Sequence, residues 1–328
     1  MLGRFFHSFY YGKAGKGDYT PENLPANRVQ LFFEALRVRW SSLVKLNMLY
    51  IVFLLPALLW TFLNYGAWQN VEAMAQTSEM LRGEADAQTL SIVGTWLLLL
   101  WPCIAITGPA TAGVSYITRN WARDQHSFFL SDFKEAFAGN WKQALPMSCI
   151  TGFVPLLVYV CYSFYGEQAE QSLLFIIPQV LVVVLGVVWL LSQQLAYMLM
   201  VTYKLTFGQV LRNALLLAVG KLPLSVGIRL LSLAFPLLCL LASILIPSVF
   251  GFALLALVLY YLLFGFAFSR FLYASYANAV CEKYINTGIE GAEVGMGLRQ
   301  VTEDDYEIDP TLPQPGSGDE DDENTELK

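Results

Sequence analysis

Ionisable and amide side chains are scarce in the apolar parts of this sequence. Two arginines, Arg229 and Arg270, and two glutamines, Gln193 and Gln194, interrupt long apolar runs that contain no Asp or Glu. The lack of carboxylates argues against a proton relay or a carboxylate cation site. The arginines either extend to the inner membrane interface or contact an anionic ligand or lipid headgroup. The glutamines either bond to neighbouring helices or line a polar path.

The motifs of common catalytic and cofactor-binding families do not occur. His7 and His126 are the only histidines, and there is no HExxH, GxSxG, P-loop or GxGxxG motif. The five cysteines form no CxxC pair, so reduced thiols are expected, with a disulfide or metal site as the alternative. Trp96, Trp101 and Trp189 lie in apolar runs and are expected to pack in the interior, although such rings also stack on sugars. We expect no catalysis, no cofactor and no metal site.

The elements that must position these residues are membrane-spanning helices. Hydrophobic residues make up 56% of the 328 and charged residues only 14%, against roughly a quarter in soluble domains. Apolar runs longer than about 18 residues predict transmembrane helices. We therefore predict an all-α membrane protein with a six-helix polytopic bundle. The predicted spans cover about residues 46–64, 90–117, 144–164, 173–203, 222–246, and a sixth that follows Gly251 and ends near Tyr273.

Composition divides the chain into three parts. Residues 1–29 are polar, lack the apolar core of a signal peptide and are predicted to be a cytoplasmic segment. Residues 30–280 form the predicted membrane domain, and residues 281–328 a cytoplasmic tail. From Glu303 to Lys328 the tail holds eleven carboxylates and one lysine, which predicts disorder from about residue 303. This acidic segment is either a solvated spacer or a tether for a basic partner.

The distribution of basic residues predicts the orientation of the spans. Fourteen lysines and arginines lie before the first span and in the second and fourth loops, whereas the opposite side holds one, Arg82. Loops rich in Lys and Arg stay in the cytoplasm. We therefore expect both termini to be cytoplasmic, in a multi-pass protein of a bacterial plasma membrane.

A small-residue stretch ends the second predicted span. Gly108 and Ala112 are four residues apart, and with Gly113 they would clear one helix face for close packing on a neighbour. Pro109 removes a backbone donor and favours a kink. We predict a packing seam here, with a functional hinge as the alternative.

An amphipathic helix is predicted between the second and third spans, from Asp132 to Trp141. Phe133, Phe137 and Trp141 form an apolar stripe expected to lie in the inner membrane interface. Gly139 and the residue after it are poor helix formers, so this helix should loosen there before the third span. Its polar side either only faces solvent or binds a cytoplasmic partner. The candidate partner contacts are Lys134, Glu135, Asn140, Trp141 and Lys142.

Three similar segments precede the odd-numbered spans. Each has a large apolar residue three positions before an alanine, at Ala35, Ala136 and Ala214. The pattern suggests three units of an interfacial helix followed by a transmembrane hairpin. The alternative is that amphipathic helices before spans look alike.

The central stretch resembles a known family. GPATAG at 108–113, then Trp121, Asp132-Phe133 and Asn140-Trp141-Lys142-Gln143, is similar to the YesL-type bacterial membrane proteins, the domain of unknown function 624 family. This resemblance implies a polytopic protein without known catalytic residues, encoded near carbohydrate ABC uptake systems. We expect an accessory partner of such a system, held in the lipid bilayer and bound to an ABC transporter permease or another membrane protein, with no nucleic acid partner. The alternative is a small-solute transporter or channel in its own right.

Overall fold

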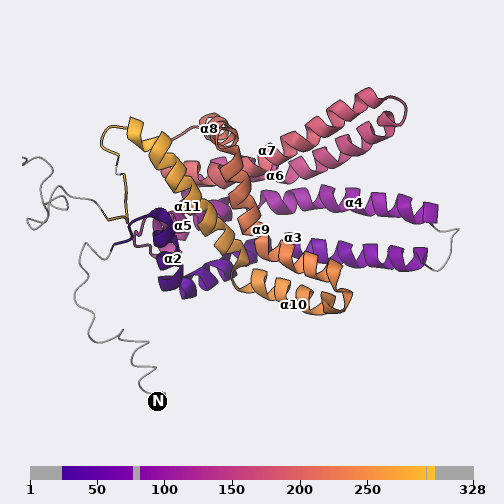
Figure 1. Ribbon diagram of the computed structural model, residues 1–328, viewed down its shortest axis with the longest axis horizontal. Coiled ribbons are helices and arrows are strands. Elements are labelled where there is room, and N and C mark those ends of the chain that lie inside the picture. The colour runs from indigo at the N-terminus through magenta and orange to yellow at the C-terminus, as the bar shows by residue number, and fades with distance from the viewer. Residues whose placement is uncertain (1–23, 77–81, 293, 300–328) are drawn as a thin grey trace, which may run out of the picture. The chain divides into compact units, whose positions relative to one another are not determined.

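The computed structural model describes residues 24–76, 82–292 and 294–299, of which Pro25–Leu298 form one compact unit. The predicted N-terminal segment up to residue 23 and the acidic tail lie outside the described residues. Within them the chain forms helices and no strands (Figure 1). The helices are α2 (Arg28–Val38), α3 (Trp40–Ala75), α4 (Arg82–Ala105), α5 (Gly108–Ala122), α6 (Phe129–Ala169), α7 (Ile176–Thr202), α8 (Phe207–Gly220), α9 (Leu222–Leu245), α10 (Phe250–Tyr260) and α11 (Phe266–Tyr284).

Six helical segments of the described chain are long and apolar enough to cross a membrane, which confirms the predicted fold class. They are Trp40–Ala75, Gly83–Ala105, Phe129–Ala169, Leu173–Thr202, Leu222–Leu245 and Pro247–Gly288. At 1.5 Å per residue the longest exceed an apolar layer about 30 Å thick, so they must tilt or project from it.

The short helix α2 precedes the first span. Asn27 caps α2 by accepting a hydrogen bond from the Gln30 backbone N–H at 2.9 Å.

The first hairpin is longer than the sequence predicts. Residues 65–75 and 82–88, predicted as loop, continue α3 and α4 instead. The Ala, Gln, Glu and Met residues of these segments have high helix propensity, so the helices continue beyond the apolar layer. The Trp60 indole N–H of α3 donates to the Trp96 carbonyl of α4 at 3.0 Å and joins the two helices.

The prediction of the second span is wrong beyond residue 105, where the helix ends. The chain turns after α4, where the Thr107 N–H bonds to the Ile104 carbonyl at 3.0 Å, and a new helix, α5, begins at Gly108. Pro109 lies in the first turn of α5, where a missing N–H costs nothing, so it helps to begin a helix rather than kinking one. Thirteen of the fifteen residues of α5 are buried. Helices α3, α6, α7 and α11 pack around it.

The prediction of a separate interfacial helix before the third span is also wrong. The predicted segment is the first part of α6, which starts at Phe129 and runs without a break through Gly139. The Asp132 carboxylate accepts a hydrogen bond from the Phe128 N–H at 2.9 Å and so stabilises the helix start from inside the first turn. Phe133 is buried and Phe137 is half-buried against the core. These rings therefore pack on protein rather than on the membrane interface, because α5 occupies that side of α6.

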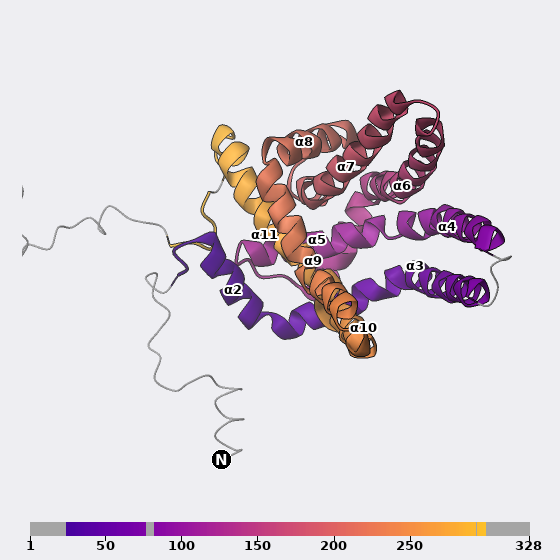
Figure 2. The same ribbon diagram turned by 45° about the vertical axis from the view of Figure 1, so that its right-hand side comes forward.

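The fourth and fifth spans, α7 and α9, follow the predicted spans more closely. A 3-10 turn, Leu173–Phe175, leads into α7, and Figures 1 and 2 show α6 and α7 as an antiparallel hairpin. The amphipathic helix α8 begins with a capping box between Thr206 and Gln209. Lys221 separates α8 from α9.

The sixth span is interrupted and longer than predicted. After a turn at Pro247–Val249, α10 is followed by a π-helical turn, Tyr261–Gly265, and then by α11. The prediction ended this span near Tyr273, but α11 continues for three more turns to Tyr284. The added turns are helical because they pack against α5, and most of their residues are buried.

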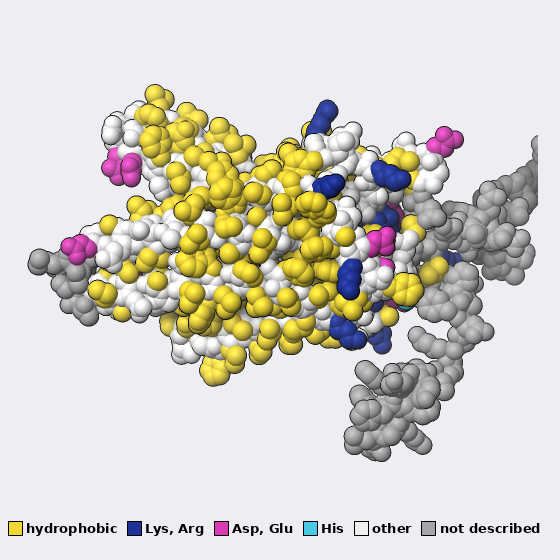
Figure 3. All heavy atoms as spheres, turned by 180° about the vertical axis from the view of Figure 1, so that it is seen from behind, with side chains coloured by type: hydrophobic (Ala, Val, Ile, Leu, Met, Phe, Trp, Pro, Cys, Tyr) yellow, Lys and Arg dark blue, Asp and Glu magenta, His cyan; other side chains and the backbone are white. Residues whose placement is uncertain are grey.

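Charge separates the two ends of the compact unit. Figure 3 shows hydrophobic side chains across its middle and Lys and Arg side chains gathered at one end. We call this the basic end: α3, α6 and α9 begin there, and α4, α7 and α11 lead to it. Exposed basic residues at this end include Lys45, Lys134, Lys142 and Arg212, and exposed acidic residues at the other include Glu84, Asp86, Glu167 and Glu170.

The three alanines of the suggested repeat have similar surroundings. Ala35 of α2, Ala136 of α6 and Ala214 of α8 are all buried. The helices that carry them differ, however, because α2 and α8 are separate helices whereas the α6 segment is fused to its span. The repeat therefore stays a hypothesis.

Candidate functional site

The two interior arginines lie on neighbouring helices. Arg229 and Ser232 are one turn apart on α9, and Arg270 and Tyr273 are one turn apart on α11, which packs against α9. The Tyr273 hydroxyl joins the helices: it accepts from Arg229 at 2.8 Å and lies 2.7 Å from the Ser232 hydroxyl. We call Arg229, Ser232, Arg270 and Tyr273 the arginine cluster.

Arg229 bonds to groups on two neighbouring helices, α11 and α7. Its guanidinium lies 4.9 Å from the centre of the Tyr273 ring and also donates to the Leu190 carbonyl of α7. Arg229 is seven residues from the start of α9, or about 10 Å, whereas Leu190 is twelve residues from the end of α7, or about 18 Å. The side chain therefore points away from the basic end, because tyrosine and carbonyl partners lie deeper in the bundle.

Arg270 is surrounded by tyrosines. Its guanidinium lies 5.3 Å from the centre of the Tyr197 ring, and Tyr50 and Tyr273 are also near it. The Tyr50 hydroxyl in turn lies 2.8 Å from the Thr111 hydroxyl of α5. In the part of the chain that the structure describes, neither Arg270 nor Arg229 forms an ion pair with a carboxylate.

The two glutamines of α7 are buried beside this cluster. The Gln194 amide N–H donates to the Ser225 carbonyl of α9 at 3.0 Å, and the Ser225 hydroxyl lies 2.6 Å from that of Tyr276. Gln193 contacts the sulfur of Met147 on α6 at 3.7 Å. Both glutamine carbonyl oxygens are buried without a hydrogen-bond partner among the described residues. The glutamines thus bond between helices and retain free acceptors.

The small-residue stretch lies in α5 rather than in the second span. A Cβ added to Gly108 would overlap the Ser148 hydroxyl and the Ala144 carbonyl of α6, and one added to Gly113 would come within 2.7 Å of the Phe133 ring. Pro109 and Ala112 are fully buried between these positions. Close approach of α5 to α6 thus depends on glycine at two places.

The candidate partner contacts lie on the exposed side of α6 near the basic end. Lys134, Glu135 and Lys142 are exposed, and Trp141 keeps 48% of its surface accessible. Asn140 instead turns back and donates to the Ala136 carbonyl at 2.9 Å. Four of the five residues therefore share an accessible surface, which we call the α6 polar face.

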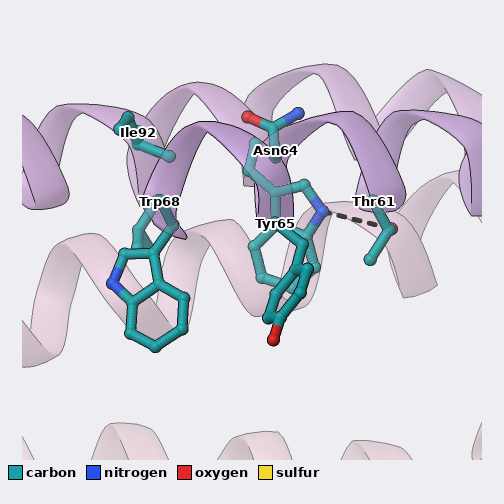
Figure 4. A pocket seen from close by; sticks show the side chains of 7 residues that line it. Thr61, Asn64, Tyr65, Trp68 and Ile92 are labelled. Carbon is teal, nitrogen blue, oxygen red and sulfur yellow. Dashed lines mark hydrogen bonds between the residues drawn. The ribbon is translucent and has the colours of Figure 1, made fainter. Parts of the chain in front are cut away.

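The deeper tryptophans are spread over three places. Trp189 of α7 packs against the core, and its buried indole N–H has no hydrogen-bond partner among the described residues. Trp96 lines a cavity of about 220 Å³ between α3 and α4, and Figure 4 shows Thr61, Tyr65 and Trp68 around it, with the Trp96 indole N–H donating to Thr61 at 3.2 Å. The Trp101 indole N–H bonds to the Cys149 carbonyl at 2.9 Å. The lining of this cavity is mostly apolar, so it offers ring surface but few polar groups to orient a sugar.

A second polar cluster ties the basic end together. Arg119 of α5 donates to the Val201 carbonyl of α7 at 2.7 Å, and Arg123 donates to Asn278 of α11 at 2.8 Å. Burial lowers the pKa of Arg119, and the charge of Arg123 lowers it further.

Among the described residues there is no group of His, Cys, Asp and Glu that could hold a metal ion, and the five cysteines are free thiols.

Sequence reasoning missed the residues that complete these clusters. Ser232 and Tyr273 each lie three positions after an interior arginine, a spacing that could have identified them. Tyr50 carries no such signal, because its partner Thr111 lies 61 residues away in the chain.

Comparison with known proteins finds a family match for only part of the chain. Neither a curated protein nor a solved structure matches it. Residues 43–162, which run from α3 through α4 and α5 into α6, match the family model described as Protein of unknown function, DUF624, and this match confirms the resemblance to the domain of unknown function 624 family over that segment.

Proposed function

We propose that this integral membrane protein is a non-catalytic accessory partner of a carbohydrate uptake system of the ABC type. The observation that carries the proposal is the exposure of its spans. In the most apolar window of the α7 span, with a mean hydropathy of 2.8, no residue is buried within the chain. The α6–α7 hairpin diverges from the α3–α4 hairpin toward its tip (Figures 1 and 2).

This arrangement favours association with another membrane protein over enclosure of a solute path by these helices. Helices that surround a solute path bury their faces on one another, whereas these hairpins present apolar faces outward. Lipid or another membrane protein can cover such faces, and small residues and polar groups can then fix the contact. The class of partner, an ABC permease, rests on the family resemblance alone.

The α6 polar face is the proposed contact on the basic side. Lys134 and Glu135 carry opposite charges, and Trp141 offers an accessible ring beside them. Aromatic and charged side chains at a surface suit a specific protein contact. The excess of Lys and Arg at this end supports a cytoplasmic location for it and for both termini in a bacterial plasma membrane.

Solute uptake in cells tests this role. Cells that lack the gene should lose uptake of a labelled sugar and regain it with the parent protein. The double change Lys134→Glu with Glu135→Lys keeps the net charge and the apolar side of α6, so membrane levels should not change while uptake falls. Full uptake without the gene would contradict the accessory role, and full uptake with the double variant would remove this surface from it.

The alternative, a small-solute transporter or channel, is favoured by the arginine cluster. Polar groups on several helices in the membrane interior are typical of substrate sites in transporters. Flux of a solute in liposomes that contain only this protein would support that role over the accessory one.

A further inference from the structure

The arginine cluster holds two positive charges without a negative one. Arg229 donates to the Tyr273 hydroxyl and lies against its ring, and Arg270 is one turn from Tyr273 on α11. Their remaining partners are tyrosines and a backbone carbonyl, which are neutral. A charge in the membrane interior is costly unless it is paired, so the cluster requires a counter-charge that the described residues do not supply.

From this geometry we propose that Arg229 and Arg270 bind an oxyanion, a carboxylate or phosphate group, where α9 crosses α11. Guanidinium groups suit both anions because their planar fork donates two parallel hydrogen bonds. The Ser232 hydroxyl donates to the Arg229 carbonyl at 2.8 Å and therefore accepts from the Tyr273 hydroxyl, so these two groups hold Arg229 in place and the guanidinium groups are left to bind the anion. This site is independent of the proposed association with a transport system.

The protein partners leave part of the site open. The Nε atom of Arg229 is buried and has no hydrogen-bond partner among the described residues. Both arginine side chains keep part of their surface accessible. The buried, unpartnered donor indicates that tyrosine and carbonyl contacts do not use the full bonding capacity of the arginine.

The depth of the cluster allows two sources for the anion. Tyr273 is eleven residues from the end of α11, or about 16 Å from it along the helix. A free anion would reach this depth as a solute, as in transporters that bind near the midplane. A phospholipid would reach it by inserting its phosphate between α7 and α9, where Arg229 meets the Leu190 carbonyl. The two sources present the same group to the arginines.

Thermal unfolding of the purified full chain tests the site in two arms. In the first arm, the protein in micelles of an uncharged alkyl-glycoside detergent, which carries no phosphate, is titrated with sodium phosphate or acetate, with sodium chloride keeping the ionic strength constant. In the second arm, phosphatidylglycerol is added to the micelles instead. A saturable rise in Tm with the free anions indicates a solute site, and a rise only with phosphatidylglycerol indicates a lipid site. Either result supports the proposal, and no rise in either arm overturns it.

Variants assign the effect to the cluster. Arg229→Lys and Arg270→Lys keep the charge but lose the guanidinium fork, so the concentration of anion or anionic lipid needed for half the Tm rise should increase about tenfold. Tyr273→Phe keeps the ring beneath Arg229 and should weaken binding less. Arg212→Lys, at an exposed position of α8, is the matched control and should behave as the parent. If the cluster variants respond at the same concentration as the parent, the anion binds elsewhere and the proposal is wrong.

Discussion

The Asn47 side-chain oxygen accepts a hydrogen bond from the Ala267 N–H at 3.0 Å, across the contact between α3 and the π-helical turn. The same side chain donates to the carbonyls of Tyr261 and Leu262, each at 2.8 Å. A π-helical turn disturbs the regular backbone bonds of a helix. A single fully buried amide thus pairs three backbone groups, and the first span stabilises the interruption of the sixth.

We expect Asn47→Leu to destabilise the protein by at least about 2 kcal/mol, because three backbone groups would lose their partner in an apolar setting. The free energy of unfolding is measured by titrating the protein in mild detergent with sodium dodecyl sulfate. Asn70→Leu, at an exposed position of the same helix, is the control and should change stability little. Equal stability of the two variants would show that the π-helical turn does not depend on Asn47.

Glycine at 108 is predicted to be essential for the contact between α5 and α6. Gly108→Ala adds a methyl group where Ser148 and the Ala144 carbonyl already lie, so the helices must move apart. We expect a loss of about 1–3 kcal/mol by the same unfolding measurement. In Gly139→Ala the methyl group meets open space on α6, and removal of a mid-helix glycine should stabilise by about 0.5–1 kcal/mol. A stable Gly108→Ala protein would contradict the close packing.

Two ion pairs at the basic end should differ in strength. Arg28 pairs with Glu282 of α11 and also donates to the Met296 carbonyl at 2.8 Å, with both charged side chains largely buried. Arg39 and Asp124 pair at 3.3 Å in a more exposed setting. We expect Arg28→Gln to cost about 2 kcal/mol, below the ~3–5 kcal/mol of fully buried pairs. Arg39→Gln should cost less than about 1 kcal/mol. Equal costs would contradict the difference in burial.

Apolar length predicted the spans well where they are uninterrupted, as in α7 and α9, since hydropathy alone decides whether a segment enters the bilayer. It failed at Thr107, because a Gly-Pro pair suits both a kink within a helix and the start of a new one. Only the packing of α5 between other helices favours the start of a new helix over a kink. The direction of Arg229 could not be predicted either, because Tyr273 lies 44 residues further along the chain.

Cysteine labelling tests the orientation of the basic end. In a background without the five native cysteines, Lys134→Cys and Asp86→Cys place thiols at exposed sites on opposite ends of the unit. With the basic end in the cytoplasm, a membrane-impermeant maleimide should label position 86 in intact cells and position 134 only after lysis. The reverse pattern would invert the orientation.

Isolation of the tagged protein from its native membranes in mild detergent, with quantitative mass spectrometry of what accompanies it, tests the accessory role most directly. We expect permease, ATPase and solute-binding subunits of a carbohydrate uptake system in fixed proportion to the tagged chain, above their level with a tagged unrelated membrane protein. Recovery of the chain with those subunits only at the control level would contradict it.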